Sequence, residues 1–123
     1  MAERAISELM GMQRDLWEQH KDAWYPMEPE YAHYSMLYMF EELGECIALM
    51  KKCGVQEIAG DPAVRSAFVT EMSDVFMYYL DTLLRFGITA EELTDAYAKK
   101  HELNKKRDYQ TEYGAIKETL KSF

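Results

Sequence analysis

The order of apolar and polar positions along this chain is typical of a helical protein. Apolar side chains recur every three or four residues over 5–20, and this spacing predicts a first amphipathic helix. A second helix is predicted from Pro29 to about Lys52, because proline suits a first helical turn and Gly54 suits the position just after a helix end. No segment alternates apolar and polar residues as a half-buried strand does.

The third predicted helix follows a strong start signal. Asp61 can cap a helix and Pro62 favours its first turn, and the helical pattern then continues to about Phe86. The centre of this helix, residues 75–80, is apolar or aromatic all the way round, which is typical of a helix that is buried on every side. In a chain of 123 residues this pattern favours cover by a second subunit.

The rest of the chain adds one more predicted helix. Thr89, with Glu92 three residues later, has the form of a capping box, so we expect a fourth helix from there to about Asp108. Residues 56–60 are predicted to form a short connection, and residues 109–123 a loose arm or a short helix. The predicted fold class is all-α, with four helices.

The connection between the first two helices contains large aromatic residues. Trp24 and Tyr25 stand beside Pro26 within residues 22–30, which indicates an ordered loop. Two interpretations of these rings remain open. Either they cover the end of a helical bundle, or they form a wall for a planar ligand.

Composition and charge narrow the classes of protein and partner. The length predicts one domain over residues 1–123, with an N-terminal helix and aromatic loop (1–28), central helices (29–108) and a tail (109–123). The apolar share of 48% argues against disorder. The net charge of -8 argues against nucleic acid or an anionic membrane as a partner, whereas an anionic small ligand could bind together with metal ions.

The start of the chain and its two cysteines predict a cytoplasmic protein. No apolar run of the kind found in signal peptides follows the first residues, and no run approaches the roughly 18 apolar residues of a membrane span. Cys46 and Cys53 lie seven residues apart on the second predicted helix, a separation of about 10 Å that is too long for a disulfide. We therefore expect reduced thiols and no membrane partner.

Three acidic residues gather on the second predicted helix without basic neighbours. Glu41, Glu42 and Glu45 fall in one helical sector about 100° wide. A solvated acidic face normally carries lysine or arginine three or four positions away, but here the nearest ones come only at the end of the helix. We therefore expect these carboxylates to meet a partner from elsewhere in the fold.

The third predicted helix supplies a second acidic pair. Glu71 and Asp74 lie within about 60° on one face, as Glu42 and Glu45 do. If the two helices form an antiparallel hairpin, the two pairs lie about 10 and 14 Å from its turn, so the four carboxylates face one another. Such a cluster needs cations, and hard carboxylate oxygens favour Mg²⁺ or Mn²⁺.

A stripe of basic and polar residues marks the fourth predicted helix. Its members recur at i, i+3, i+7 and i+10 within a sector of about 80°, and they are Tyr97, Lys100, Asn104 and Arg107. Two cations and an amide arranged in this way suit phosphate oxygens. The other interpretation is a solvated face, since three more lysines lie nearby.

Together these motifs resemble the MazG-like all-α nucleoside triphosphate pyrophosphohydrolases, the superfamily that also includes the dimeric dUTPases. The resemblance spans about residues 34–109, and the residues that carry it are Glu41-Glu42-Leu43-Gly44-Glu45, Glu71-Met72-Ser73-Asp74 and Tyr97-x-x-Lys100-x-x-x-Asn104-x-x-Arg107. It implies a four-helix MazG-like bundle that is completed by oligomerisation, as a homodimer or homotetramer. It also implies that base specificity resides in the N-terminal third of the chain.

The resemblance implies a role for each acidic residue. The Mg²⁺ ligands would be Glu42, Glu45, Glu71 and Asp74. Glu41 would be a ligand of a second metal or the base that orients the attacking water, and Glu45 would also take part in catalysis.

The resemblance also implies a nucleotide substrate. Lys100, Asn104 and Arg107 would bind the triphosphate, and Tyr97 would line the site. The expected reaction converts a nucleoside or deoxynucleoside triphosphate to the monophosphate and pyrophosphate, which suits housecleaning of the nucleotide pool.

Two other functions fit parts of the sequence. A di-iron bundle would need Glu-x-x-His pairs on two helices, but Glu30 with His33 forms only one, and neither His20 nor His101 completes a second. A non-enzymatic helical interaction module, with a metal-binding acidic cluster, is the remaining alternative. Thermal stability measured with and without Mg²⁺ tests this alternative, because a carboxylate cluster gains stability from a bound metal, whereas a solvated acidic face does not.

Overall fold

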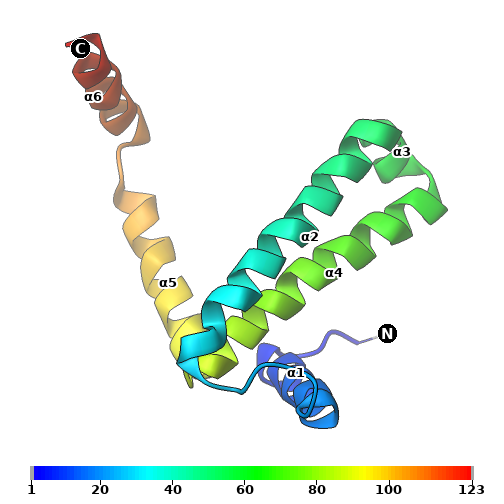
Figure 1. The fold of residues 1–123 in the computed structure, drawn as a ribbon. Coiled ribbons are helices and arrows are strands. Elements are labelled where there is room, and N and C mark those ends of the chain that lie inside the picture. The colour runs from blue at the N-terminus through cyan, green and yellow to red at the C-terminus, as the bar shows by residue number, and fades with distance from the viewer. Residues whose placement is uncertain (1, 123) are drawn as a thin grey trace. The chain divides into compact units, whose positions relative to one another are not determined.

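The structure, a computed structural model that describes residues 2–122, is built from helices (Figure 1). The elements are α1 (Ile6–His20), the 3-10 turn η1 (Pro29–Tyr31), α2 (Ala32–Cys53), α3 (Val55–Gly60), α4 (Pro62–Arg85), α5 (Ala90–Lys106) and α6 (Tyr109–Lys121). No strand occurs among the described residues, and the predicted all-α class is confirmed. Of these helices, α3 comes in addition to the four that were predicted, and α6 is one of the two forms expected for the tail.

The chain divides into two compact units, one that extends to Ala90 and one that begins at Glu91. In the first unit, α2 and α4 run side by side in opposite directions, as Figure 1 shows, and α3 joins them at one end of the pair. The α1 helix packs against α4. The predicted antiparallel hairpin of the two motif-bearing helices is therefore present.

The ends of α2 and α4 follow from local chemistry. Gly54 has a φ of 81°, a conformation that glycine adopts without strain, and it ends α2. Asp61 caps α4, because its carboxylate accepts hydrogen bonds from the backbone N–H of Ala63 at 2.9 Å and of Val64 at 3.4 Å. The segment between these signals was predicted as a short connection, but it forms the helix α3.

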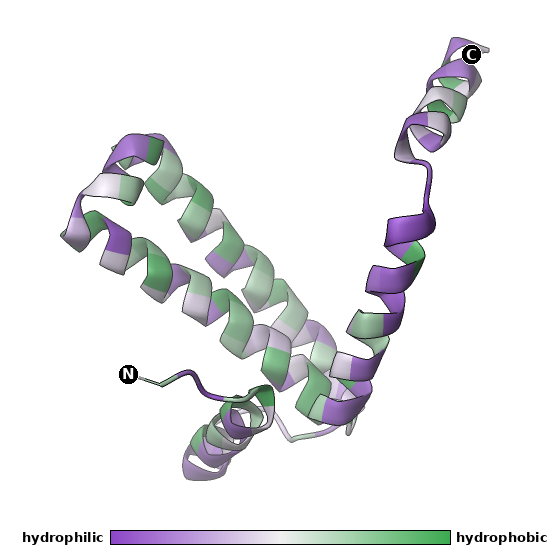
Figure 2. Cartoon of the chain, turned by 180° about the vertical axis from the view of Figure 1, so that it is seen from behind, coloured by the Kyte–Doolittle hydropathy of each residue, from purple (hydrophilic) through white to green (hydrophobic). Residues whose placement is uncertain are grey.

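Few apolar side chains of the first unit are fully buried. Among the described residues they are Met10, Ala32, Cys46 and Leu80. The centre of α4 was predicted to be buried on every side, yet Phe76, Met77 and Tyr79 are exposed in the single chain. The surface of α2 is also apolar, with the Phe40 side chain 70% exposed, and Figure 2 shows hydrophobic residues along both helices.

The second unit consists of most of α5 together with α6. Polar residues predominate along α5 (Figure 2). Asp108 caps α6 by accepting a hydrogen bond from the backbone N–H of Thr111 at 3.0 Å, and α5 ends two residues earlier, at Lys106. The tail is thus a short helix, the second of the two forms predicted for it. Among the described helices, none combines the length and the apolar character that a membrane span requires.

Candidate metal site and adjoining cavity

Three carboxylates from α2 and α4 converge between the two helices. Glu42 comes from α2, and Glu71 and Asp74 come from α4, and one oxygen of each lies within 4.8 Å of the others. All three side chains are half-buried. We call this group the acidic trio. The antiparallel pairing of the helices brings together residues that are up to 32 positions apart, since 74 minus 42 is 32.

The other two predicted acids of α2 lie outside the trio. Glu45 is exposed and so is Glu41, and neither belongs to the group of converging oxygens. Around the helix axis, Glu45 points about 60° and Glu41 about 100° away from Glu42. Glu45 is nevertheless near enough for its charge to act on Glu42.

The trio carries uncompensated negative charge. Burial raises the pKa of the Glu42 carboxyl above its ordinary value, and the charges of Asp74, Glu71 and Glu45 raise it further. The pKa of the Tyr78 phenol is raised by burial and then by the charges of Glu42 and Asp74. A divalent cation would relieve this repulsion, and three hard oxygen donors match Mg²⁺ or Mn²⁺.

The two cysteines have no place in this chemistry. Cys46 is buried beside the trio, and burial followed by the charges of Glu71 and Glu42 raises the pKa of its thiol. A raised pKa keeps the thiol neutral and therefore weakly nucleophilic. Glu30 and His33, which the di-iron alternative required, are both exposed, and no histidine joins a group of three candidate metal ligands among the described residues.

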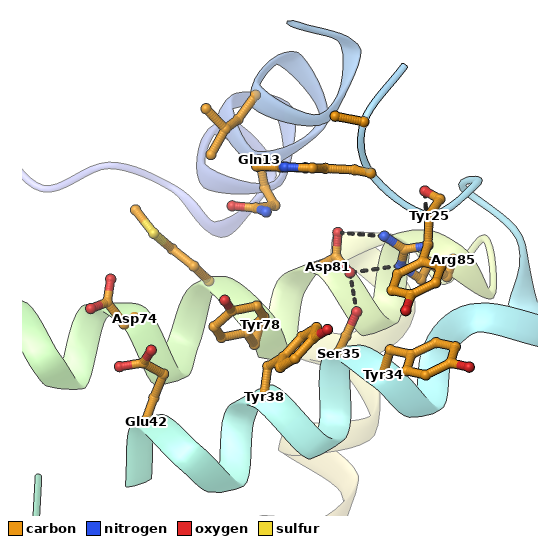
Figure 3. A pocket seen from close by; sticks show the side chains of 14 residues that line it. Gln13, Tyr25, Tyr34, Ser35, Tyr38, Glu42, Asp74, Tyr78, Asp81 and Arg85 are labelled. Carbon is orange, nitrogen blue, oxygen red and sulfur yellow. Dashed lines mark hydrogen bonds and ion pairs between the residues drawn. The ribbon is translucent and has the colours of Figure 1, made fainter. Parts of the chain in front are cut away.

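A cavity of about 580 Å³ adjoins Glu42 and Asp74 (Figure 3). Its walls carry five aromatic side chains, which are Trp24, Tyr25, Tyr34, Tyr38 and Tyr78. Tyr25 stacks on Tyr34 with ring centroids 4.2 Å apart and planes inclined by 1°. The rings of Tyr38 and Tyr78, from α2 and α4, approach to 5.6 Å. The loop residues Trp24 and Tyr25 thus form part of the wall of a cavity.

A buried polar network closes one end of this cavity. Arg85 Nε donates to Asp81 Oδ2 at 2.7 Å, and the Ser35 hydroxyl donates to the same oxygen. The Arg85 guanidinium also donates to the backbone carbonyls of Tyr25 and Pro26. Figure 3 shows the Ser35, Asp81 and Arg85 side chains grouped together. The network ties the aromatic loop to α4.

Sequence reasoning missed this network. Its only local signal is the spacing of Asp81 and Arg85, which are four residues apart on a helix that is otherwise largely apolar. The contact with Pro26, 59 residues away from Arg85, has no signature in the sequence. Such a network is found only once the tertiary fold is known.

The predicted phosphate-binding residues belong to α5 and the link that follows it. Arg107 binds Glu112 of α6 with a shortest N–O distance of 2.7 Å and donates to Asn104 Oδ1 at 3.3 Å. Lys100 is exposed, and its charge lowers the pKa of Glu112, as the hydrogen bond from Arg107 does more strongly. Tyr97 is 75% exposed. Asn104 and Arg107 are therefore in contact within the second unit, with a carboxylate from α6 as a third member.

The fold and the site define a class, that of all-α proteins with a carboxylate cluster suited to a divalent cation on two antiparallel helices. Residues 44–122 match the family model of dATP/dGTP pyrophosphohydrolase, and since this is more than half of the chain, the chain belongs to that family. The resemblance to nucleoside triphosphate pyrophosphohydrolases is thereby confirmed. No curated protein and no solved structure was found to match the chain.

The matched range divides the site residues. It includes Glu45, Glu71, Asp74 and the basic stripe of α5, but it begins after Glu42. Most of the cavity wall, from Gln13 to Tyr38, also precedes it. The family match therefore covers the α4 side of the cavity but not its α1, loop and α2 sides.

Proposed function

We propose that this protein hydrolyses the purine deoxynucleoside triphosphates dATP and dGTP to the monophosphate and pyrophosphate, with Mg²⁺ or Mn²⁺ as cofactor. The observation that carries the proposal is the acidic trio, whose oxygens lie within 4.8 Å of one another beside a cavity of ligand size. Membership of the dATP/dGTP pyrophosphohydrolase family supports the reaction and the substrate class.

The trio would hold the cation. Glu42, Glu71 and Asp74 each offer one carboxylate oxygen, and Glu45, whose charge acts on Glu42, would be a further ligand. A bound Mg²⁺ supplies Lewis acidity toward phosphate oxygens and lowers the pKa of water. The half-buried position of the trio strengthens its interaction with a cation, because the local dielectric is lower than that of water.

The exposed acids of α2 would serve the proton transfer. As the oxygen of the attacking water bonds to phosphorus, Glu41 or Glu45 accepts the proton of that water. The bond between the α- and β-phosphates breaks, and pyrophosphate leaves with its electron pair. Exposure of both carboxylates to solvent supports this role, since an exposed base can return its proton to bulk water.

The stripe of α5 would bind the triphosphate. Arg107 and Lys100 supply positive charge, Asn104 supplies an amide, and Tyr97 lines the site. Arg107 pairs with the Glu112 carboxylate, an anion that a phosphate would replace. These assignments rest on the motif.

We also propose a homodimer or homotetramer in the cytoplasm that controls the nucleotide pool. The exposed apolar side chains of α2 and α4 support an oligomer, because a single chain leaves them in water. Both cysteines are free thiols, which agrees with a reducing compartment.

The test is a pyrophosphate assay with the four canonical dNTPs, Mg²⁺ and, in parallel, EDTA. Turnover of dATP and dGTP that EDTA abolishes is expected, as is a loss of at least about a hundredfold in kcat for Glu71→Gln. Glu57→Gln, at an exposed position of α3, is the matched control and should keep full activity. If Mg²⁺ raises the melting temperature but no nucleotide is hydrolysed, the protein is a metal-binding interaction module and the proposal is wrong.

A further inference from the structure

The backbone carbonyl of Tyr25 accepts hydrogen bonds from two helices. Trp17 Nε1 of α1 donates to it at 2.9 Å, and the Arg85 guanidinium of α4 donates to it at 3.5 Å. The same guanidinium donates to the carbonyl of the next residue, Pro26. Two side chains from two helices therefore hold one short piece of the loop, and we call Tyr25 and Pro26 the clamped segment.

The ring of Tyr25 contacts a third helix. It stacks on Tyr34 of α2, with ring centroids 4.2 Å apart and planes inclined by 1°, and on Tyr31 of η1, with centroids 5.6 Å apart. Tyr25 thus contacts α2 through its side chain, and α1 and α4 through its carbonyl. Because a side chain moves with its own backbone, the hydrogen bonds at the carbonyl also determine where the ring lies.

The clamped segment lies at one end of the cavity, away from the acidic trio. Figure 3 shows Glu42 and Asp74 at the other end. Tyr25, Tyr34 and Arg85 are grouped together beside the loop. A nucleotide whose phosphates are held at the trio would extend its planar part along the cavity toward these rings, and aromatic rings stack on planar ligands.

Trp17 and Arg85 differ in their access to the cavity. Arg85 lines the cavity, whereas Trp17 lies outside the group of described residues that line it. Trp17 is half-buried on α1, and its indole reaches the cavity wall through the hydrogen bond to Tyr25. An effect of this N–H group on a ligand in the cavity must therefore be transmitted by the clamped segment.

We propose that Trp17 and Arg85 are positioning residues, which set the affinity for substrate by holding the Tyr25 ring in the cavity wall. This inference rests on the proposed function. Residues 21–28 form no helix, and a loop that is ordered only on binding costs affinity. The clamp orders the loop in advance. Because the clamped segment lies away from the trio, it contributes to binding and not to the chemical step.

The test compares Trp17→Phe with Thr70→Val. Phenylalanine keeps an aromatic ring and removes the N–H donor. Thr70 is the matched control, since its exposed hydroxyl also donates to a backbone carbonyl, that of Ser66 at 3.0 Å, and it lies outside the cavity wall. For W17F we expect KM for dATP to rise about tenfold with little change in kcat. T70V should match the wild type, and an unchanged KM in W17F would overturn the inference.

A second variant tests whether both residues act through the same segment. Arg85→Lys keeps a positive charge beside Asp81, but a lysine carries its donors on one nitrogen and does not reach the carboxylate and the loop carbonyls together. R85K should also raise KM about tenfold. The double variant W17F/R85K should raise KM no further than the stronger single variant, because the two changes release one segment. Effects that multiply would overturn the inference.

Hydrogen exchange followed by mass spectrometry separates positioning from general support of the fold. In W17F the amides of residues 22–28 should exchange severalfold faster, while those of α2 and α4 exchange at the wild-type rate. The amide of Glu28, which donates to the Pro26 carbonyl at 2.8 Å, lies in this region. If exchange instead rises throughout the chain and W17F loses kcat at an unchanged KM, Trp17 only supports the fold and the inference is wrong.

Binding of labelled deoxyadenosine, measured by equilibrium dialysis without metal, makes the test independent of catalysis. Wild type and T70V should bind equally, and W17F should bind about tenfold more weakly. If no dNTP is hydrolysed but this pattern is found, the proposed function fails and the positioning role stands. If hydrolysis occurs and deoxyadenosine binds equally to all three proteins, the positioning role fails alone.

Discussion

Arg85 and Asp81 form an ion pair one turn apart on α4, with side chains that are 5% and 6% exposed. Such a pair is stabilising relative to either partner alone, since removal of one leaves the other charge buried. Here the guanidinium also reaches the carbonyls of Tyr25 and Pro26, so one residue joins a helix to the cavity wall. Loss of Arg85 should therefore affect both stability and the shape of the cavity.

We predict that Arg85→Met lowers the free energy of unfolding by about 3 kcal/mol, because it strands the Asp81 carboxylate in the interior. Urea unfolding followed by circular dichroism measures the change. Lys99→Met is the matched control, since the pair of Lys99 with Asp95 is exposed and should contribute less than about 1 kcal/mol. Equal losses in the two variants would contradict the prediction.

Glu42 allows a prediction about pH. Its pKa is raised in the folded protein by burial and by Asp74, so without divalent cations the ionised form destabilises the fold. This penalty is fully present above the raised folded-state pKa, and it disappears as the pH falls below the unfolded-state value. Glu42→Gln should therefore be more stable than the wild type at about pH 7, and the advantage should shrink toward about pH 4.

The measurement is urea unfolding in EDTA across that pH range, with Glu57→Gln as the control at an exposed carboxyl. Addition of Mg²⁺ should reverse the order at neutral pH, because only the wild type retains the full trio. A wild-type protein that is the more stable of the two at pH 7 in EDTA would show that the trio is not repulsive.

At the scale of elements, the helix ends follow signals that lie within a few residues of one another. Asp61, Pro62 and Gly54 could be interpreted from the sequence because a cap or a positive φ depends on local chemistry. Residues 55–60 carry no comparable signal, and the helix α3 was missed there. Its formation depends on packing against α2 and α4, which a local pattern does not encode.

Asp61→Ala should lower the free energy of unfolding by about 1 kcal/mol, since the first turn of α4 loses its cap for two backbone N–H groups. Thermal unfolding of the full chain gives the value. Ser66→Ala, one turn further along the same helix and also exposed, should change stability by less than about 0.5 kcal/mol. A larger effect at Ser66 than at Asp61 would refute the role of the cap.

The candidate site was predictable in part, because the spacing of residues within one helix is a local property of the sequence. The predicted hairpin and the helical period placed Glu42, Glu71 and Asp74 close together. The structure also brings these three residues together. Glu45 was expected to join them, but it lies outside the trio, because the spacing of residues along a helix does not give its exact rotation about its axis. The burial of Gln13 was not predicted, because it arises only when α1 packs against α4.

At the scale of the whole molecule, the apolar surface of α2 and α4 remains to be accounted for. The side chains of Phe40, Ile47, Val69 and Met72 are all exposed by at least 44% in the single chain. Large apolar side chains that are exposed along two neighbouring helices favour a contact with another protein. In the proposed oligomer, a second copy of the same helices would cover these side chains, as expected for a helix that is apolar on every side.

We predict a dimer or a larger oligomer in light scattering at micromolar concentration. Phe40→Glu should shift the mass toward that of a single chain of 14.4 kDa, because it places a charge in the apolar contact. Val55→Glu, which adds the same charge at an exposed position of α3, is the control. A wild-type mass equal to one chain would refute the oligomer.

The Arg107–Glu112 pair has a consequence for the charge balance of binding. Because the Arg107 guanidinium is already paired within its own unit, the proposed phosphate would take the place of a carboxylate, and the number of ion pairs would be conserved. At the acidic trio the opposite would hold, since an arriving cation would remove the repulsion that Asp74, Glu71 and Glu45 exert on Glu42. In the proposed function, cation binding at the trio would neutralise charge, whereas phosphate binding at Arg107 would exchange one anion for another.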